Sequence, residues 1–123
     1  MQHKSKVTLV MGASENPERY SNKAIVRLRQ KGHEVLAFGM RHGQVKDVVI
    51  SNELPKDTNI HTITLYLNPG RQKPFYDFIL HSNAKRVIFN PGTENHELER
   101  MLEEHDIEYT EACTLVLLSI GDY

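Results

Sequence analysis

The sequence predicts an α/β fold with a mostly parallel, five-stranded sheet and helices on both faces. The first observation is that short apolar runs alternate along the chain with stretches whose apolar residues have helical spacing. Such alternation requires crossover connections, which are typical of parallel sheets. The second observation is that the apolar runs are nearly continuous, as in strands buried on both faces. With 123 residues and 39% hydrophobic content, the chain fits a single domain over residues 1–123.

The elements expected in the first half follow from residue pattern and from the residues that interrupt it. Residues 7–11 are apolar and β-branched and precede a glycine, which predicts a strand. Residues 21–31 place apolar side chains on one face and also precede a glycine, which predicts a helix and its end. An apolar run predicts a second strand at 35–38. Residues 48–50 are expected to form a short extended piece, and 53–57 a loop because proline and polar residues dominate there.

The second half repeats the alternation of strands and helices. Proline in the first turn and apolar residues at helical spacing predict a helix at 74–83, and the same spacing predicts a helix at 94–105. Residues 112–120 are predicted to close the domain as a short helix, with a strand as the alternative. Apolar runs predict the three remaining strands: 60–67, 86–89 and 107–109.

Net charge and cysteine content restrict the class of protein. A net charge of −1 gives no basic field for nucleic acid or an anionic membrane, so neither is expected as a partner. The single cysteine, Cys113, excludes an intramolecular disulfide and fits a reducing compartment. No apolar run has the length and flanks of a signal peptide or a transmembrane helix. These features predict a cytoplasmic protein.

The turn after the first strand carries groups suited to phosphate. Gly12 permits close approach of the backbone, and Ser14 and Ser21 offer hydroxyls at the start of a helix, where N–H groups favour anions. Arg19 adds a positive charge. The turn has one of the three glycines of the dinucleotide fingerprint and lacks the Gly-Lys-Ser/Thr of a P-loop. A phosphate loop and a plain tight turn with a surface arginine are therefore both compatible with the residues.

The end of the second strand argues against a simple NAD site. NAD-binding folds place an acidic residue there to bind the ribose hydroxyls, whereas this chain has Arg41. Arginine suits an additional phosphate on the ribose, as in NADP or coenzyme A. A solvated loop arginine is the simpler alternative when the residue is considered alone.

Two Asn-Pro-Gly segments follow the third and fourth expected strands. In an open parallel sheet both should line the same crevice as the first turn. Turn chemistry explains the prolines and glycines but does not require asparagine twice. The segments therefore contribute candidate ligand contacts: Asn68 and Pro69 in the first, and Asn90, Pro91 and Gly92 in the second.

Other reactive residue types have simpler interpretations. Thr93 is expected to cap the next helix rather than to contact a ligand. Cys113, at the same edge, is either a small buried residue or a thiol that meets the end of a ligand.

The seven histidines show no metal-ligand spacing on one element, and the zincin-like start at His96 fails because Arg100 replaces the second histidine. The acidic residues of that helix are expected to form a solvated face: Glu97, Glu99, Glu103 and Glu104.

Residues 7–21, a strand followed by Gly-Ala-Ser-x-Asn-Pro-x-Arg-Tyr-Ser, resemble the opening of the small stand-alone CoA-binding-domain proteins. These proteins are similar to the N-terminal CoA-binding domain of the succinyl-CoA synthetase α subunit. The resemblance covers nearly the whole chain, including residues 90–94 and the late cysteine. It implies a Rossmann-like, doubly wound fold with coenzyme A or an acyl-CoA in the crevice. The candidate cofactor-binding residues are Gly12, Ala13, Ser14, Asn16, Pro17, Arg19, Tyr20, Ser21, Arg41, Asn68, Pro69, Asn90, Pro91, Gly92 and Cys113.

By this resemblance, Gly12, Ala13, Ser14 and Arg19 would lie along the phosphates, and Arg41 near the 3′-phosphate. The chain departs from the family after the second strand, where Gly39-Met40-Arg41 replaces the common Asn-Pro-Lys. The phosphorylated histidine of the synthetase lies in a domain that this chain lacks, so its chemistry is not implied. We therefore expect a binding module without catalysis of its own. An NADP-dependent oxidoreductase and a structural or regulatory partner domain are the alternatives, and a homodimer or a protein partner stays open.

Overall fold

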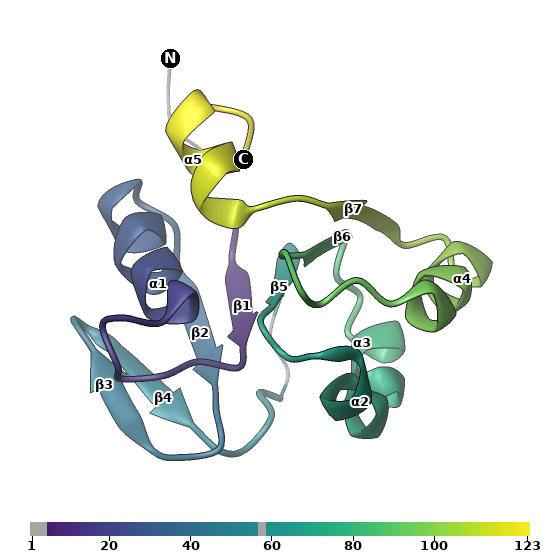
Figure 1. The fold of residues 1–123 in the computed structure, drawn as a ribbon, viewed down its shortest axis with the longest axis horizontal. Helices are drawn as coiled ribbons and strands as arrows, with labels where there is room; N and C mark the ends of the chain where they lie inside the picture. The colour runs from purple at the N-terminus through teal and green to yellow at the C-terminus, as the bar shows by residue number, and fades with distance from the viewer. Residues whose placement is uncertain (1–4, 57–58) are drawn as a thin grey trace.

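The computed structural model describes residues 5–56 and 59–123, which form one sheet with helices on both faces (Figure 1). The strands are β1 (Thr8–Met11), β2 (Val35–Phe38), β3 (Gly43–Val45), β4 (Val48–Ser51), β5 (Thr62–Leu65), β6 (Arg86–Phe89) and β7 (Glu108–Glu111). The helices are α1 (Tyr20–Gln30), α2 (Pro69–Gln72), α3 (Tyr76–His81), α4 (His96–Glu104) and α5 (Thr114–Ile120), with a 3₁₀ turn η1 (Lys73–Phe75). The strand order is β3-β4-β2-β1-β5-β6-β7, and every neighbouring pair is parallel except β3–β4.

The prediction of five strands was wrong, because the described residues contain seven. The five predicted strands correspond to β1, β2, β5, β6 and β7, and the short extended piece is β4. Strand β3 was missed because it has only three residues, and the turn to β4 lacks the Asn-Gly or Asp-Gly pair that marks a tight hairpin. Lys46 instead supplies the left-handed backbone of that turn, with φ of 55°.

Some predicted boundaries also shift. The helix expected to begin at Pro74 begins at Pro69 and is interrupted by η1, since two prolines each occupy a first turn. Strand β5 ends at Leu65 rather than at residue 67. The closing segment is helical, which decides between the two alternatives. Residues 53–56 form neither helix nor strand, and Asp57 of the predicted loop lies outside the described residues. Within the described ranges, every helix is too short or too polar to cross a membrane.

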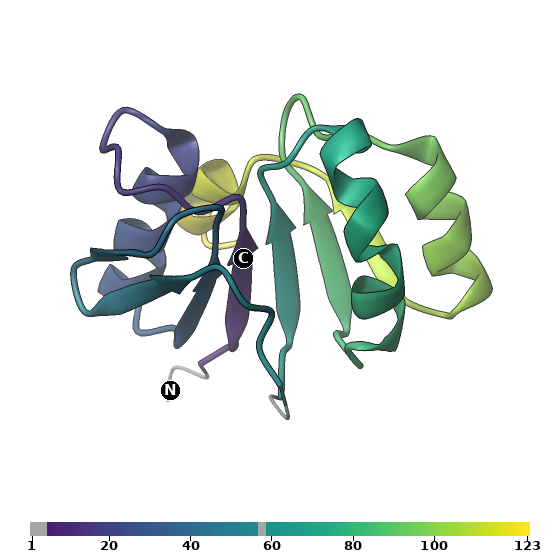
Figure 2. The same cartoon turned by 90° about the horizontal axis from the view of Figure 1, so that it is seen from below.

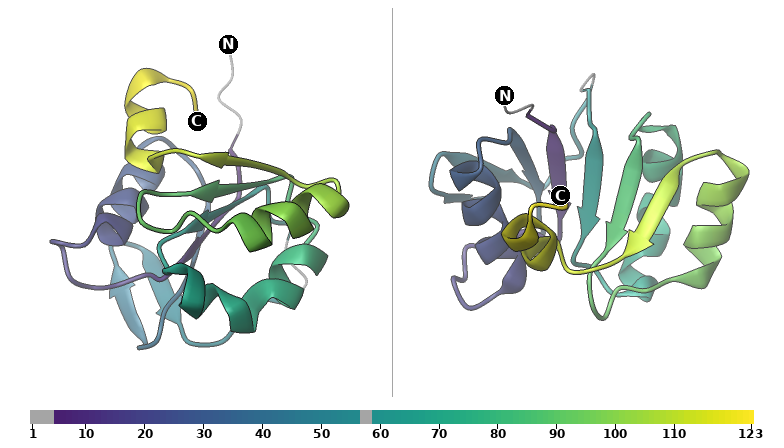
Figure 3. Two further views of the ribbon diagram at one scale, coloured as in Figure 1. Left: turned by 45° about the vertical axis from the view of Figure 1, so that its right-hand side comes forward. Right: turned by 90° about the horizontal axis from the view of Figure 1, so that it is seen from above.

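Helices lie on both faces of the sheet (Figure 2 and Figure 3), and an apolar core fills the space on each face. Helices α1 and α5 cover one face, where Ile25, Leu28 and Leu118 pack against β1, β2 and β4. Helices α3 and α4 cover the other, where Ile79 and Leu98 pack against β1, β5 and β6. Alternate residues of one strand enter different cores, as the strand period of two requires. Because all strands except β3 run parallel, their carboxyl ends lie at the same edge of the sheet, between the two helical layers.

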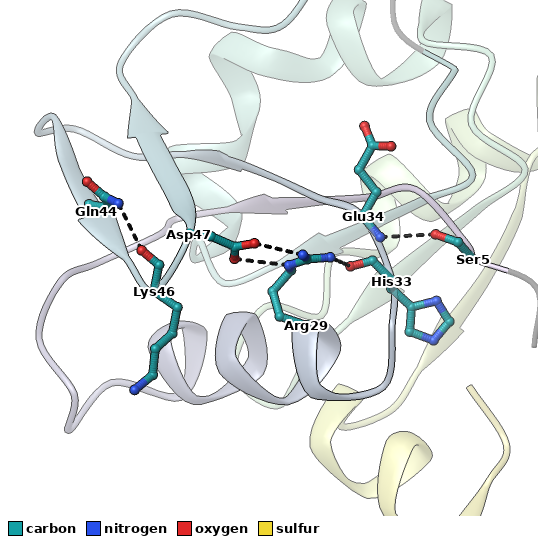
Figure 4. Close-up of polar contacts among 7 residues, drawn as sticks. All are labelled: Ser5, Arg29, His33, Glu34, Gln44, Lys46 and Asp47. Carbon is teal, nitrogen blue, oxygen red and sulfur yellow. Dashed lines mark hydrogen bonds and ion pairs between the residues drawn. The ribbon is translucent and has the colours of Figure 1, made fainter.

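A side-chain contact fastens the β3–β4 hairpin to α1 (Figure 4). Arg29 donates two hydrogen bonds to Asp47, from Nε to Oδ1 at 3.0 Å and from an Nη atom to Oδ2 at 2.7 Å. Its other Nη atom donates to the His33 carbonyl at 2.8 Å. The guanidinium holds the pKa of Asp47 below its usual value. The β3–β4 hairpin at the edge of the sheet is thus connected to α1.

Candidate functional site

The turn at the end of β1 fits closely against the neighbouring strand. Gly12 has φ of +95°, and a Cβ there would lie 3.0 Å from the backbone carbon of Tyr66. The N–H groups of Gly12 and Ala13 both donate to the Phe38 carbonyl, at 2.9 Å each. The backbone conformation and the close approach together require glycine at position 12. The loop that begins here, residues 12–19, is called the first loop below.

The first loop packs against the connection from β2 to β3, which contains Arg41. A Cβ on Gly39 would lie 2.5 Å from the Ala13 carbonyl oxygen. The Glu15 side chain lies over Gly43, and its Oε2 accepts a hydrogen bond from the Gln44 N–H at 2.8 Å. The sequence analysis assigned no role to Glu15, Gly39 or Gly43. Their contacts bring Arg41 and the first loop to the same part of the sheet edge.

Polar side chains shape the first loop from within. Ser14 Oγ accepts from the Asn16 N–H at 3.1 Å, and Asn16 Oδ1 accepts from the Glu18 N–H at 2.9 Å. Buried Asn22 donates to the Ser14 carbonyl at 3.0 Å, a contact that the sequence analysis missed. Ser14 and Asn16, both predicted ligand residues, therefore hold the loop in shape. Pro17 is exposed in the same loop.

Cationic side chains surround this edge. Arg19 occupies the N-cap position of α1, whose first turn contains no acidic residue. Arg19, Arg41 and Arg71 are exposed, and within the described residues their side chains form no hydrogen bond or ion pair. Arg71 lies in α2 and was not predicted, although it directly follows Asn-Pro-Gly. These exposed arginines carry positive charge that no counter-ion from residues 5–56 or 59–123 balances by direct contact.

The first turn of α1 contains two further predicted residues. Tyr20 is 67% exposed, and Lys23 Nζ lies 5.4 Å from the centre of its ring. Ser21, in contrast, is 4% exposed, so its hydroxyl lies within the protein. Only Tyr20 of this pair presents its side chain at the surface.

The first Asn-Pro-Gly segment starts a helix. Asn68 is exposed, and its Oδ1 accepts from the Arg71 N–H at 2.9 Å. Pro69 is the first residue of α2. Asn68 is therefore an N-cap, and its amide group is at the surface beside the helix start.

The second Asn-Pro-Gly segment connects three elements. Asn90 is 2% exposed, and its Nδ2 donates to Thr64 Oγ1 at 2.7 Å and to the Leu65 carbonyl at 2.9 Å. Its Oδ1 accepts from the Thr114 N–H at 2.8 Å, so it joins β5 and β6 to the start of α5. Pro91 and Gly92 are exposed, and Gly92 has φ of +93°. Whether the segment contacts a ligand stays a prediction.

Tyr66 and Cys113 lie next to this connection. The Tyr66 hydroxyl is buried and has no hydrogen-bond partner within the described residues. Burial raises its pKa well above the usual value, and the nearby Cys113 thiol adds to this effect. Cys113 is half-buried at the N-cap position of α5. The edge therefore continues from Gly12 through Tyr66 and Asn90 to Cys113.

A second polar network holds the loops after β5 and β6 together, and the sequence analysis missed it. Fully buried Gln72 donates to the carbonyls of Leu67 and Thr93, at 2.8 Å each. Asn95 donates to Gln72 Oε1 at 2.8 Å and caps α4 through the Leu98 N–H. The expectation that Thr93 caps this helix was wrong, because its hydroxyl donates to the Asn90 carbonyl. An asparagine three residues before a buried leucine was the available signal.

A cavity of about 510 Å³ lies elsewhere, beside β2 and β4. Its walls include Leu36, Val49 and Leu54, and no residue of the first loop or of the Asn-Pro-Gly segments lines it. The predicted residues instead lie in the loops and helix starts that follow the strands. In open α/β sheets, ligands bind outside this edge of the sheet.

Comparisons with known proteins agree with this architecture. A family model described as a CoA binding domain matches residues 6–119. A solved structure described only as an uncharacterized protein is 45% identical, with a TM-score of 0.94, and the match covers 98% of this chain and 100% of that one. A conserved hypothetical protein from Pyrococcus furiosus is 31% identical, with a TM-score of 0.71, over 86% of this chain and 91% of that one.

A Thermus thermophilus protein shares 19% identity with a TM-score of 0.83, over 97% of this chain and 91% of its own, which demonstrates a common fold alone. Among curated proteins, none matches the chain.

Proposed function

Because the chain belongs to the CoA-binding domain family, we propose that it binds coenzyme A or an acyl-CoA at the carboxyl edge of its sheet, without catalysis of its own. The observation that carries this proposal is the family match over residues 6–119. The arrangement of the first loop supports it. Gly12 brings backbone close to the strand ends, and the start of α1 directs N–H groups and the positive end of the helix dipole toward the same region.

In this proposal the first loop and Arg19 bind the phosphates. Arg19 lies at the start of α1, where the helix dipole and the guanidinium attract an anion together. Ser14 and Asn16 contribute by holding the loop rather than by direct contact, because their side-chain oxygens accept backbone hydrogen bonds. Tyr20, with its exposed ring, borders the same position.

The adenosine end is assigned to the connection that contains Arg41. Glu15 and Gly39 pack this connection against the first loop, which supports assigning Arg41 and Arg19 to one ligand region. Arg41 therefore binds the 3′-phosphate in our proposal, and Arg71 adds charge on the other side of β1. Buried Asn90 acts by positioning Thr114 and the start of α5, next to Cys113.

The proposal can be tested by isothermal titration calorimetry with coenzyme A, dephospho-CoA, NADPH and ATP. We expect coenzyme A to bind, and dephospho-CoA to bind about tenfold more weakly or worse because one charge-assisted contact is lost. Arg41→Ala should remove this difference between the two ligands. Arg19→Ala should weaken both ligands, and Arg27→Ala, at the far end of α1, should change neither.

Each other outcome has a distinct meaning. Absence of binding by all four ligands at millimolar concentration would contradict the proposal and favour a structural or regulatory role. Equal affinity for coenzyme A and dephospho-CoA would refute the role of Arg41 alone. Tighter binding of NADPH than of coenzyme A would favour an NADP-dependent protein.

A further inference from the structure

Helix α4 and strand β7 lie at the other end of the sheet from the β3–β4 hairpin (Figure 1). They carry a second group of chemically active side chains. His96, Glu99 and Glu111 each offer one potential ligand atom, and these atoms all lie within 4.8 Å of one another. None of the three belongs to the coenzyme site proposed above. The group is therefore a separate feature that needs its own explanation.

The fold produces this juxtaposition from residues that are not neighbours in the sequence. His96 and Glu99 are three residues apart on α4, so they share one face of the helix. Glu111 is the last residue of β7 and is in register with Phe89, the last residue of β6. Because α4 begins at the edge where β7 ends, the imidazole and both carboxylates meet there.

Glu99 is the unusual member of the group. The sequence analysis expected it on a solvated helix face, and this was wrong, because only 8% of the residue is exposed. Its Oε2 is buried and has no hydrogen-bond partner within the described residues. An unpartnered buried carboxylate is unfavourable unless a proton or a cation compensates its charge.

The neighbouring charges increase this cost. Glu111 and Glu103 lie close to Glu99 and oppose its ionisation, whereas His96 favours it. Burial and the contact with Glu111 raise the pKa of Glu99 to about 7. Glu103 is already engaged, since the Tyr109 hydroxyl donates to its Oε1 at 2.5 Å. Two facing carboxyl groups can be compensated by one shared proton or by one divalent cation.

The His96 imidazole favours a divalent cation over a shared proton as the group that compensates the two carboxylates. A shared proton requires only the carboxyl pair, whereas a nitrogen donor next to two carboxylates is a ligand set for a first-row divalent transition metal. We propose that His96, Glu99 and Glu111 bind one such ion, of the Zn²⁺ class, and leave its remaining coordination positions to water or an anionic group. His96 and Glu111 are exposed, so an ion can reach the site from solvent.

The test uses the untagged full chain and titrates it with ZnCl₂ by calorimetry, and with CoCl₂ by visible absorption. We expect one ion per chain and a rise in Tm when Zn²⁺ is added, because a ligand that binds only the folded state stabilises it. Glu99→Gln and His96→Gln should each weaken binding by about tenfold or more and reduce the cobalt absorption. Both substitutions are close to isosteric, so the folded state should be kept.

Two matched controls lie on or next to the same helix. Glu104→Gln removes one exposed carboxylate of α4, and His105→Gln removes the imidazole that follows its last turn, 6.1 Å from the His81 ring. Neither should change the affinity for Zn²⁺. Loss of binding in His105→Gln would overturn the proposal by moving the ion to the His81–His105 pair.

Two further results would also overturn it. One is wild-type affinity in Glu99→Gln. The other is no binding of either ion to the wild-type chain; a higher Tm of ion-free Glu99→Gln would then indicate a shared proton between Glu99 and Glu111. These measurements use no coenzyme, so their result is independent of the function proposed above.

Discussion

Residues 68–70 and 90–92 are the same three residue types, Asn-Pro-Gly, and both follow strands that are neighbours in the sheet. Asn68 is exposed and caps a helix, whereas Asn90 is buried and its side chain forms three hydrogen bonds, two with β5 and one with the start of α5. The register explains the difference. Leu65 pairs with Phe89, so the residue next to Asn90 in the sheet is Tyr66. Asn68 is the third residue after the end of β5, two residues further along than Tyr66.

The comparison teaches that position relative to the strand end determines the role of a turn residue. Asparagine directly after a strand lies between sheet and helix and must satisfy all its polar atoms within the protein. Asparagine two residues later reaches the surface and can serve as an N-cap. The repeated motif therefore does not indicate a repeated function.

The largest expected effect separates the two asparagines. Asn90→Asp replaces the Nδ2 donor with an acceptor that faces Thr64 Oγ1 and the Leu65 carbonyl, and it buries a charge. We expect a loss of about 3 kcal/mol or more in the free energy of unfolding. Asn68→Asp keeps an equally good N-cap, so its change should stay within about 0.5 kcal/mol. Urea denaturation of both variants at neutral pH measures the two free energies of unfolding. Equal losses would contradict the different roles assigned to Asn90 and Asn68.

An intermediate effect on stability is expected at the glycines of the two Asn-Pro-Gly segments, Gly70 and Gly92. Gly92 has φ of +93° with open space around it, so Gly92→Ala should cost about 1–2 kcal/mol through backbone strain alone. Gly70 lies within α2, and a Cβ there would make an ordinary contact 3.5 Å from Asn68 Oδ1. Gly70→Ala should therefore gain about 0.5–1 kcal/mol from helix propensity. Chemical denaturation should give opposite signs, and the comparison fails if both variants are destabilised.

The smallest effect at neutral pH is expected at Tyr66, the neighbour of Asn90 in the sheet. Its buried hydroxyl has no partner within the described residues, so removing it in Tyr66→Phe should leave stability at pH 7 unchanged or raise it by less than about 1 kcal/mol. Burial raises the pKa of Tyr66 above its model-compound value of 10.0, so the folded state disfavours the tyrosinate.

The raised pKa of Tyr66 predicts the direction in which the free energy of unfolding changes with pH. The wild-type protein loses stability as the pH rises above about 10, where an unfolded tyrosine ionises. The Tyr66→Phe variant should lose less stability over that pH range, because only the other tyrosines titrate in it. Urea midpoints at neutral and alkaline pH test this, and parallel pH curves for the two proteins would show that Tyr66 does not contribute.

The fold was largely predictable from the sequence because each main strand is a continuous apolar run next to a helical pattern. The family match and the parallel order of β2, β1, β5, β6 and β7 confirm that prediction. The antiparallel strand β3 was not predictable in this way, because its turn depends on Lys46 in a left-handed conformation. Lysine in a turn of this kind carries no local signal.

The location of the candidate site stays a prediction, drawn from glycine at the end of β1 and arginine after β2. The contacts within this region were not predictable from the sequence. The roles of Glu15, Gln72 and Asn95 depend on which loops pack together, and no local pattern encodes that packing. Glu99 shows the same limit, because helical spacing placed it on a polar face that β7 then covers.

The place of β1 in the middle of the sheet has a consequence for how the chain folds. Its two neighbours are β2 and β5, and Thr8 pairs with Thr62, far along the sequence. Pairings of such long sequence separation slow folding, because chain entropy is lost before the contacts form. During synthesis β1 and β2 emerge well before β5, and one hydrogen-bonding edge of β1 stays uncovered until then. Until β5 covers it, that edge can pair with another molecule.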